Sequence, residues 1–204
     1  MSHLSALPLA SPSLFSDGLF PEHGNGPIRR SAPFGEEPGF YEPAGLWLYG
    51  NVRLLHTPLA CVEEAHGPPE HLPSQLDAVE RQAEELVLTS KTLVCGIHSA
   101  AHMRTAVVPL RWGAPRLVVF SGGFLYHLGE NLKGEPFRAA RLWRYEWDSK
   151  TDLAVSRRSP GKKPTFARHN PTVDRLVAHL ACGTWPGLSR LTDSLTPILD
   201  TKPI

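Results

Sequence analysis

The chain of 204 residues has few cysteines, no long hydrophobic run and almost no net charge. Its three cysteines are odd in number and widely spaced, which fits reduced thiols and argues against a disulfide-stapled secreted domain. No apolar run approaches the roughly 20 residues that a membrane-spanning helix needs. The formal charge of +1 argues against a protein that coats nucleic acid indiscriminately, while a local basic patch is compatible with it. We therefore expect a cytoplasmic protein with no membrane partner.

Motifs for cofactor binding and for catalysis are also missing. Gly122-Gly123 is not part of a Gly-x-Gly-x-x-Gly fingerprint, so no nicotinamide or flavin cofactor is predicted. Ser121 does not stand in a Gly-x-Ser-x-Gly elbow, and no carboxylate–histidine pair can be assigned to it. The Pro-Gly-Gly-x-Gly-Thr-x-x-Glu motif of lysine-decarboxylase-like nucleotide hydrolases is absent as well. The sequence predicts a protein that is not an enzyme and uses no cofactor.

Proline and glycine are abundant, with 20 and 17 residues, and many of them fall within residues 1–45. That stretch has no sustained hydrophobic periodicity, which is typical of a poorly ordered arm or one that lies along a surface. The remaining residues, 46–204, are enough for one medium-sized domain with a sizeable core. We expect an N-terminal arm over 1–45 and a single folded domain over 46–204.

Short apolar runs alternate with helical patterns in the folded part. Strand, helix, strand, helix, strand is typical of crossover units and of a parallel sheet, so an α/β fold with a mostly parallel sheet is predicted. Ligands in such sheets bind beyond the carboxyl ends of the strands. The predicted strands are 59–62, 92–95 and 116–120, which should be adjacent, and the predicted helices are 72–88, 99–108 and 172–180.

Five segments in this part have distinctive residues. Residues 46–55 combine aromatic residues with Gly-Asn and Leu-Leu, and residues 96–102 are Gly-Ile-His-Ser-Ala-Ala-His. Residues 119–131 contain Val-Phe-Ser-Gly-Gly and then Gly-Glu-Asn, and residues 143–147 are rich in aromatics. Residues 166–180 contain Phe-Ala-Arg-His-Asn and, after it, Arg-Leu-Val-Ala-His-Leu.

In this order the five segments resemble the DNA-processing protein A (DprA) family. The family's Gly-Ile-Asp-x-x-Ala-His appears here with His98 in place of the aspartate, and the similarity covers roughly residues 46–181. The resemblance implies a Rossmann-like three-layer fold. It also implies a protein that binds single-stranded DNA during DNA processing, uptake (transformation) or recombination and that hands the strand to a recombinase. Whether the chain is a monomer or a homodimer is left open.

The resemblance also implies which residues bind. Residues 138–175 are the most basic stretch and have aromatic residues interleaved, as a surface for single-stranded nucleic acid requires. The DNA-binding residues implied are Lys162, Lys163, Arg168, Asn170 and Arg175. The residues implied for the ligand pocket are Gly96, His98, His102, Ser121, Gly122 and Gly123.

Other interpretations of these residues remain open. The Gly-Gly pair could be a tight turn that needs positive φ, not a close approach to a ligand. Trp143, Tyr145 and Trp147 alternate, as do residues on one buried face of a strand. Cys95, His98 and His102 have a spacing that zinc ligands can have, but no fourth ligand is evident, and no metal is predicted.

The sequence also departs from the family pattern. Glu63-Glu64-Ala65 stands where the family has Gly-Ser-Arg after its first strand, and carboxylates there would repel a phosphate. The loop after Cys95 is shortened, and residues 182–204 contain no counterpart of the family's last strands. A second hypothesis is therefore a degenerate Rossmann-like module that senses a nucleotide-derived ligand or mediates protein contacts. A nucleotide hydrolase is the third.

Overall fold

The computed structural model describes residues 37–65, 72–165 and 170–189, which contain one six-stranded sheet. The strands are β1 (Gly39–Tyr41), β2 (Leu46–Gly50), β3 (Leu59–Ala60), β4 (Thr92–Cys95), β5 (Arg116–Phe120) and β6 (Leu153–Ser156). The α-helices are α1 (Pro73–Leu88), α2 (Ala100–Arg111), α3 (Phe124–Leu128) and α4 (Pro171–Ala181). The 3-10 turns are η1 (Glu42–Ala44), η2 (Val52–His56), η3 (Glu63–Ala65) and η4 (Arg138–Leu142).

The sheet has the strand order β1-β2-β6-β5-β4-β3. Strands β3 to β6 are mutually parallel, while β2 pairs antiparallel with β6 and β1 pairs antiparallel with β2. The predicted α/β fold with a mostly parallel, Rossmann-like sheet is confirmed. So is the prediction that strands near 59–62, 92–95 and 116–120 are adjacent and parallel, with α1 joining the first two.

Each long helix begins at a residue suited to that position. Gln75 caps the start of α1 because its side chain accepts a hydrogen bond from the Leu72 backbone N–H at 2.7 Å. Ser99 and Asn170 cap α2 and α4 in the usual way, each accepting a backbone N–H three residues further on. Pro171 follows Asn170 at the first helical position, where a missing N–H costs no hydrogen bond.

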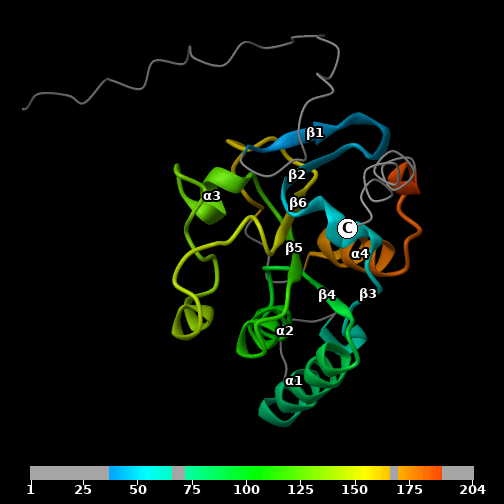
Figure 1. Ribbon diagram of the computed structural model, residues 1–204, viewed down its shortest axis with the longest axis vertical. Helices are drawn as coiled ribbons and strands as arrows, with labels where there is room; N and C mark the ends of the chain where they lie inside the picture. Colours follow the sequence, from blue (N-terminus) through cyan, green and yellow to red (C-terminus); the bar gives the residue numbers. More distant parts are fainter. Residues whose placement is uncertain (1–36, 66–71, 166–169, 190–204) are drawn as a thin grey trace, which may run out of the picture. The chain divides into compact units, whose positions relative to one another are not determined.

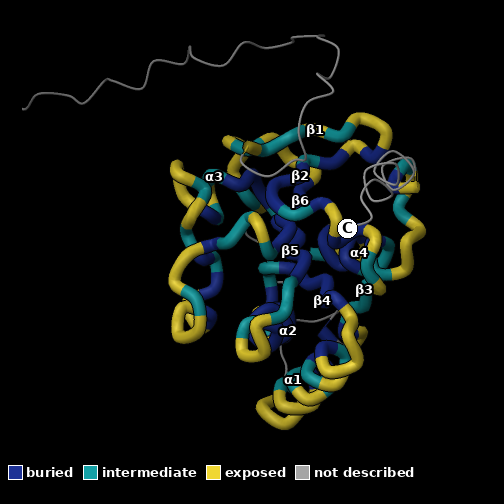
Figure 2. Tube along the Cα trace, in the orientation of Figure 1, coloured by how far each residue is buried: buried dark blue, intermediate teal, exposed yellow. Residues whose placement is uncertain are grey.

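Side chains of the central strand alternate between two core clusters. Leu117 and Val119 pack with α4 on one face of the sheet, while Val118 and Phe120 pack with α2 and α3 on the other. Figure 1 shows α4 on one side of β5 and α2 and α3 on the opposite side, which makes three layers. The sheet is buried almost throughout, and α1 is exposed along its outer face (Figure 2).

The chain between β5 and β6 is held by a buried network of charges. The Arg116 side chain, fully buried, donates from Nε to Asp152 at 2.8 Å and also pairs with Glu135. Arg144 pairs with Asp152 as well, and Arg116 Nη1 donates to the Ala106 carbonyl of α2 at 2.9 Å. Segments that form little regular structure are thereby tied to β5, β6 and α2.

The structure differs from the sequence analysis at three places. Residues 143–147 form no strand: Trp147 N–H donates to the Lys133 carbonyl, Trp147 is buried, and Trp143 and Tyr145 are exposed. Strand β6 was not predicted at all. Strand β1 lies within the stretch expected to be an arm; residues 1–36 of that stretch lie outside the described residues. No helix in the described ranges is long and apolar enough to span a membrane.

Candidate functional site

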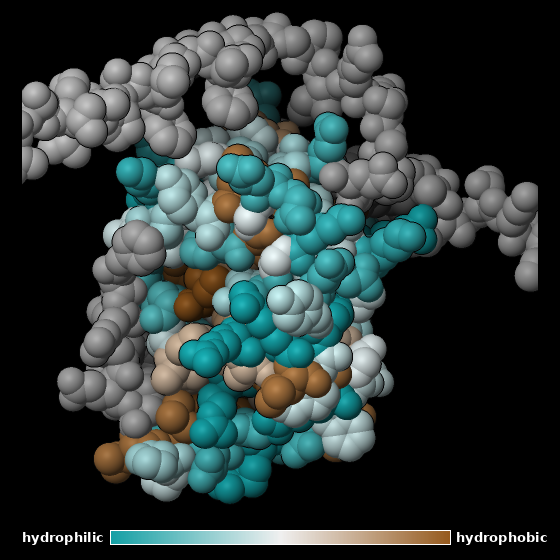
Figure 3. Space-filling model, turned by 90° about the vertical axis from the view of Figure 1, so that its left-hand side faces the viewer, coloured by the Kyte–Doolittle hydropathy of each residue, from teal (hydrophilic) through white to brown (hydrophobic). Residues whose placement is uncertain are grey.

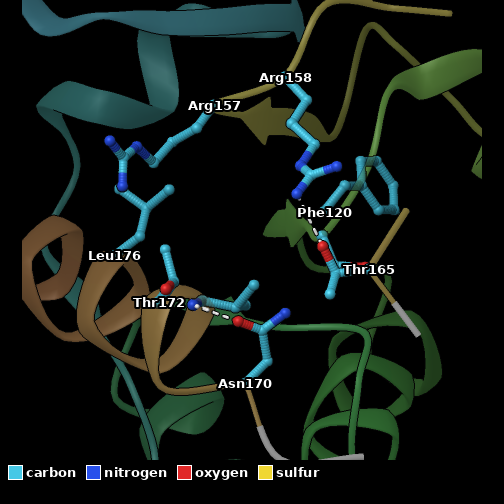
Figure 4. Close-up of a pocket in the computed structure, with 9 residues that line it drawn as sticks. Phe120, Arg157, Arg158, Thr165, Asn170, Thr172 and Leu176 are labelled. Carbon is cyan, nitrogen blue, oxygen red and sulfur yellow. Dashed lines mark hydrogen bonds between the residues drawn. The ribbon is translucent and has the colours of Figure 1, made fainter. Parts of the chain in front are cut away.

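A cavity of about 160 Å³ opens beyond the carboxyl ends of β5 and β6, beside the start of α4. The sheet contributes Phe120, Ser121, Arg157 and Arg158, and α4 with its cap contributes Asn170 and Thr172. Figure 4 shows the two arginines on the β6 side of the cavity and Asn170 and Thr172 on the α4 side. This is the edge of a parallel sheet at which ligands bind in α/β proteins.

The end of β6 places the two arginines. Ser156, the last residue of β6, is buried, and its Oγ donates to the Gly122 carbonyl at 2.8 Å while accepting the Arg158 backbone N–H at 3.0 Å. This hydroxyl therefore joins the ends of β5 and β6 and fixes the backbone from Ser156 to Arg158.

The side chains of both arginines are also oriented. Arg158 donates to the Lys163 carbonyl at 3.0 Å and to Thr165 Oγ1 at 2.8 Å. The Arg157 guanidinium lies 5.9 Å from the centre of the Trp185 ring, within cation–π range. Within the described part of the chain neither guanidinium has a carboxylate partner, so their charge is available to an anion.

The start of α4 adds further positive potential. The first N–H groups of a helix have no partner within it, and the helix dipole is positive at this end. Asn170 Oδ1 accepts one of these, the Val173 N–H, at 3.3 Å. The hydroxyl of Thr172 lines the cavity next to them. Two guanidiniums, a hydroxyl and a helix N-terminus together are suited to bind a phosphate group.

The structure brings some of the predicted DNA-binding residues to this cavity and leaves others outside it. Asn170 lines it, and Lys162 and Lys163 are exposed on the neighbouring loop. Arg175 is exposed on α4 but is not among the lining residues. Arg168 lies outside the described residues.

Of the predicted pocket residues, Ser121 lines the cavity, but Gly122 and Gly123 face the chain itself. A Cβ on Gly122 would lie 2.5 Å from Cα of Pro164, and one on Gly123 would lie 2.1 Å from the Pro160 carbonyl oxygen. The close approach that these glycines allow is therefore used by the loop 159–164, not left open for a ligand. Neither glycine has positive φ, so the alternative of a positive-φ turn is also wrong.

Of Gly96, His98 and His102, the other predicted pocket residues, the two histidines meet at the Asp174 carboxylate of α4 and Gly96 contacts His102. Nε2 of His98 and Nε2 of His102 lie 3.0 Å and 2.9 Å from Asp174 Oδ1. His102 Nδ1 accepts the Gly96 N–H at 3.0 Å, so the ring proton is on Nε2 and is donated to Asp174. This clamp joins the loop after β4 to the first turn of α4, next in the chain to Thr172 and Val173, which line the cavity.

His98, His102 and Asp174 place their ligand atoms within 4.8 Å of one another, close enough for a metal ion. The hydrogen bond from Gly96 argues against that use. A histidine that binds a metal normally donates a proton from its other nitrogen, whereas Nδ1 of His102 accepts one. Cys95 does not join the group: its Sγ faces the Leu117 carbonyl at 3.7 Å, and burial raises its pKa to about 12. The cluster fits a hydrogen-bonded clamp better than a metal centre.

Burial alone would raise the pKa of Asp174, but the hydrogen bonds from His102 and His98 outweigh it and hold that pKa well below its usual range. Sequence reasoning did not single out Asp174, because nothing in the spacing of a residue 72 positions from His102 links the two. It also missed Arg157 and Arg158 as site residues. Their signal was a pair of cations at the end of a short strand, Leu153–Ser156, whose first three residues are apolar.

Comparisons with known proteins add little to this geometry. No family model matches the chain, and no curated protein does. Among solved structures the chain is similar to DNA processing protein A from Helicobacter pylori, reported for its single-stranded DNA binding mode, with 18% sequence identity and a TM-score of 0.46. The match covers 66% of this chain and 56% of that one, so the chain spans little more than half of its length.

Proposed function

We propose that the chain binds the phosphate backbone of single-stranded DNA at the cavity beyond β5 and β6. The observation that carries the proposal is the pair Arg157 and Arg158, unpaired with any described carboxylate and facing the N-terminus of α4 across a cavity. Arginine forks bind phosphate oxygens in a directed way, and the positive end of the α4 dipole lies beside the same cavity. The cavity binds one phosphodiester group of a longer strand.

The size of the cavity and its surroundings favour a polymer over a free nucleotide. At about 160 Å³ the cavity is smaller than the roughly 300 Å³ at the lower end of small-molecule sites. Lys162, Lys163 and Arg175 are exposed near its rim, on the loop after β6 and on α4, where further phosphates of the same strand could reach them. The resemblance of residues 46–181 to the DprA family points to the same ligand.

The finer parts of the proposal follow from that resemblance. They are a cytoplasmic role in DNA uptake or recombination, delivery of the strand to a recombinase, and self-association. Each needs its own test, and none is required for the binding itself.

The direct test is binding of a fluorescent oligothymidylate of about 20 nucleotides across a series of salt concentrations. Each neutralised phosphate contributes about 0.7 to the salt slope for single strands. Because both arginines are assigned to one phosphodiester group, the double variant Arg157→Ala/Arg158→Ala should bind more weakly and lower the slope by about 0.7, with little dependence on base sequence. Arg168→Ala with Arg175→Ala should have the same kind of effect if both contact the strand.

The matched control is Arg81→Ala with Lys91→Ala, which removes two exposed cations at α1 and after it. It should leave affinity and slope unchanged. If the wild type shows no salt-dependent binding at low ionic strength, the DNA proposal is wrong.

A binding experiment with a mononucleotide distinguishes the DNA proposal from the second hypothesis, a module that senses a nucleotide-derived ligand. Deoxythymidine monophosphate, measured by calorimetry, should bind weakly or not at all, because Glu63 is exposed where the related family has a phosphate-binding loop. Micromolar affinity for the mononucleotide, with no gain for the oligonucleotide, would favour a nucleotide sensor.

A further inference from the structure

A larger cavity of about 680 Å³ lies on the other face of the sheet, between α2 and η4. Its lining is apolar along most of its length, and Figure 3 shows this side of the molecule, with hydrophobic residues among hydrophilic ones. We call it the α2–η4 groove. Its apolar lining residues are Ala100, Met103, Val107, Phe137, Ala139, Leu142 and Trp143.

Several large apolar side chains of the groove are exposed. Met103 is 45% exposed, Trp143 is 45% exposed and Leu142 is 82% exposed. Single exposed apolar residues are ordinary, but three that line one groove form a contiguous surface, which is typical of a binding site. The proposed DNA site does not use any of them.

The groove is built on a rigid base. Phe137, the residue before η4, and Ala140 within it are buried. The Arg116 guanidinium lies 5.4 Å from the Phe137 ring and donates to the Ala106 carbonyl of α2. Both walls are therefore fastened to the same buried arginine. A preformed groove binds a partner without first ordering its own walls.

Arginines surround the apolar lining. Arg104 and Arg111, on the α2 side, share the Glu80 carboxylate. On the η4 side, Arg141 donates to the Glu135 carbonyl oxygen, and no ion pair with Arg138 or Arg141 occurs among residues 37–65, 72–165 and 170–189. The η4 rim of the groove thus carries positive charge that no described carboxylate neutralises.

We propose that the α2–η4 groove binds an amphipathic α-helix of another protein whose apolar face is flanked by acidic residues. Helices dock into such grooves through apolar residues at i, i+3 or i+4 and i+7. The α2 wall has 12 residues, or about 18 Å of helix, which matches a partner of about three turns. Glu or Asp beside the apolar face would then reach Arg138, which lines the groove.

Two other occupants fit less well. Single-stranded DNA would need open aromatic faces, but the Arg111 guanidinium lies 5.0 Å from the Trp143 ring centre and covers one face. The remaining lining residues are mostly aliphatic. A second copy of this chain in a two-fold contact would place the same patch against itself, so the positively charged rims would meet.

The probe is a displayed library of 14-residue helical peptides with Leu at the apolar positions and either Glu or Lys at the flanking positions, selected against the full chain. Glu-flanked peptides should be enriched. An enriched peptide should bind in fluorescence anisotropy, and its counterpart with Lys in place of Glu should bind at least tenfold more weakly.

Variants assign the binding to the groove. Leu142→Glu and Met103→Glu should each weaken binding of the enriched peptide at least tenfold, because both side chains line the groove. The matched control, Leu88→Glu, changes a side chain of α1 that is 59% exposed and should have no effect. Arg138→Glu should weaken binding of the Glu-flanked peptide and strengthen binding of the Lys-flanked peptide.

Three results would overturn the proposal. They are no enrichment of Glu-flanked over Lys-flanked helices, equal binding by the Leu142→Glu and Leu88→Glu variants, and a concentration-dependent dimer that Leu142→Glu dissociates. Competition of the peptide by oligothymidylate would assign the groove to DNA and so would also contradict it. Loss of oligothymidylate binding in the Arg157→Ala/Arg158→Ala variant tests the DNA proposal separately and leaves the groove unaffected.

Discussion

The amino ends and the carboxyl ends of the parallel strands form two edges of the sheet, and a pair of arginines lies at each. One pair is neutralised by carboxylates and the other is not. At the amino edge, Arg116 and Arg144 are neutralised by Glu135 and Asp152, whose side chains are fully buried. At the carboxyl edge, Arg157 and Arg158 are exposed and have no carboxylate partner in the described ranges. The same residue type thus fastens the chain at one edge and is free to bind an anion at the other. What decides between the two is whether carboxylates are buried alongside.

Replacing Arg116 should have the largest effect of all. Arg116→Met leaves Glu135 and Asp152 buried without their main cation, and we expect a loss of about 3–5 kcal/mol in the free energy of unfolding at pH 7. Urea titration measures this loss in the free energy of unfolding. The control is Arg81→Met, which replaces an exposed arginine of α1.

The loss should shrink on acidification. Burial raises the pKa of Glu135, although Arg116 opposes this. A carboxyl with a raised folded-state pKa stabilises the fold below its unfolded value of about 4.3, and this is lost as the pH rises through the folded value. In the Arg116→Met variant this opposition is removed, so the pKa of Glu135 should rise further and the variant should gain more stability on acidification than the wild type. The difference in unfolding free energy between the two should therefore narrow from pH 7 toward about pH 4.3. A gap that stays constant would contradict the role of the buried carboxylate.

Replacing Asp174 at the carboxyl edge should have the next largest effect. Asp174→Asn removes the charge that accepts hydrogen bonds from His98 and His102, at an expected cost of about 2 kcal/mol. Because the pKa of Asp174 is lowered, its stabilisation is complete above about pH 4 and is lost as the pH falls further. Urea titrations should show the difference from wild type closing below that pH. Asp77→Asn, on an exposed aspartate of α1, should cost less than about 0.5 kcal/mol.

His127 provides a smaller, pH-dependent effect near the end of β5. Its ring stacks on Phe120 with centroids 4.7 Å apart, and burial lowers its pKa to about 4. In the unfolded chain His127 is protonated below about pH 6.5, whereas in the folded chain it stays neutral down to about pH 4. The free energy of unfolding therefore falls as the pH drops from about 6.5 to 4. His127→Phe should remove about 1–2 kcal/mol of that loss at pH 5, seen as a flatter profile of unfolding free energy against pH. An unchanged profile would show that His127 is not its source.

The two arginines at the carboxyl edge should contribute least to stability. Arg157→Ala and Arg158→Ala should each change the free energy of unfolding by under about 0.5 kcal/mol, as exposed substitutions usually do. Thermal and urea unfolding check this in the variants prepared for DNA binding. A cost above about 2 kcal/mol would mean that these arginines hold the fold together, and the contrast between the edges would disappear.

Most of the sheet could be predicted because its signals are local. Residues 117–120 are apolar throughout, as in a strand buried on both faces, and α1 shows a helical period over four turns. Strand β6 escaped prediction because three apolar residues, Leu153–Val155, without a flanking helical pattern carry little information. The alternation at residues 143–147 was misleading, since the chain there turns around Trp147 and forms no ladder.

The site was harder to predict than the fold, because it is made by contacts between distant residues. The carboxyl-edge rule directed attention to Ser121, which does line the cavity. It could not identify Arg157 and Arg158 without β6, nor Asp174 without knowing that α4 packs beside the loop after β4. The glycine pair drew attention for its lack of side chains, and only the structure shows that the loop 159–164 fills the space beside it.

The clamp at Asp174 has a consequence for the order in which the chain folds. The contacts of Arg116 with Glu135 and Asp152 close loops of 19 and 36 residues, whereas the contact of His102 with Asp174 spans 72 residues. Closing longer loops costs more chain entropy, so we expect α4 to dock after the β5–β6 unit has formed. Its docking completes the cavity, and the last helix to arrive therefore also brings the capacity to bind. A partly folded chain, including one still emerging from the ribosome, would carry Arg157 and Arg158 without the opposite wall of their site.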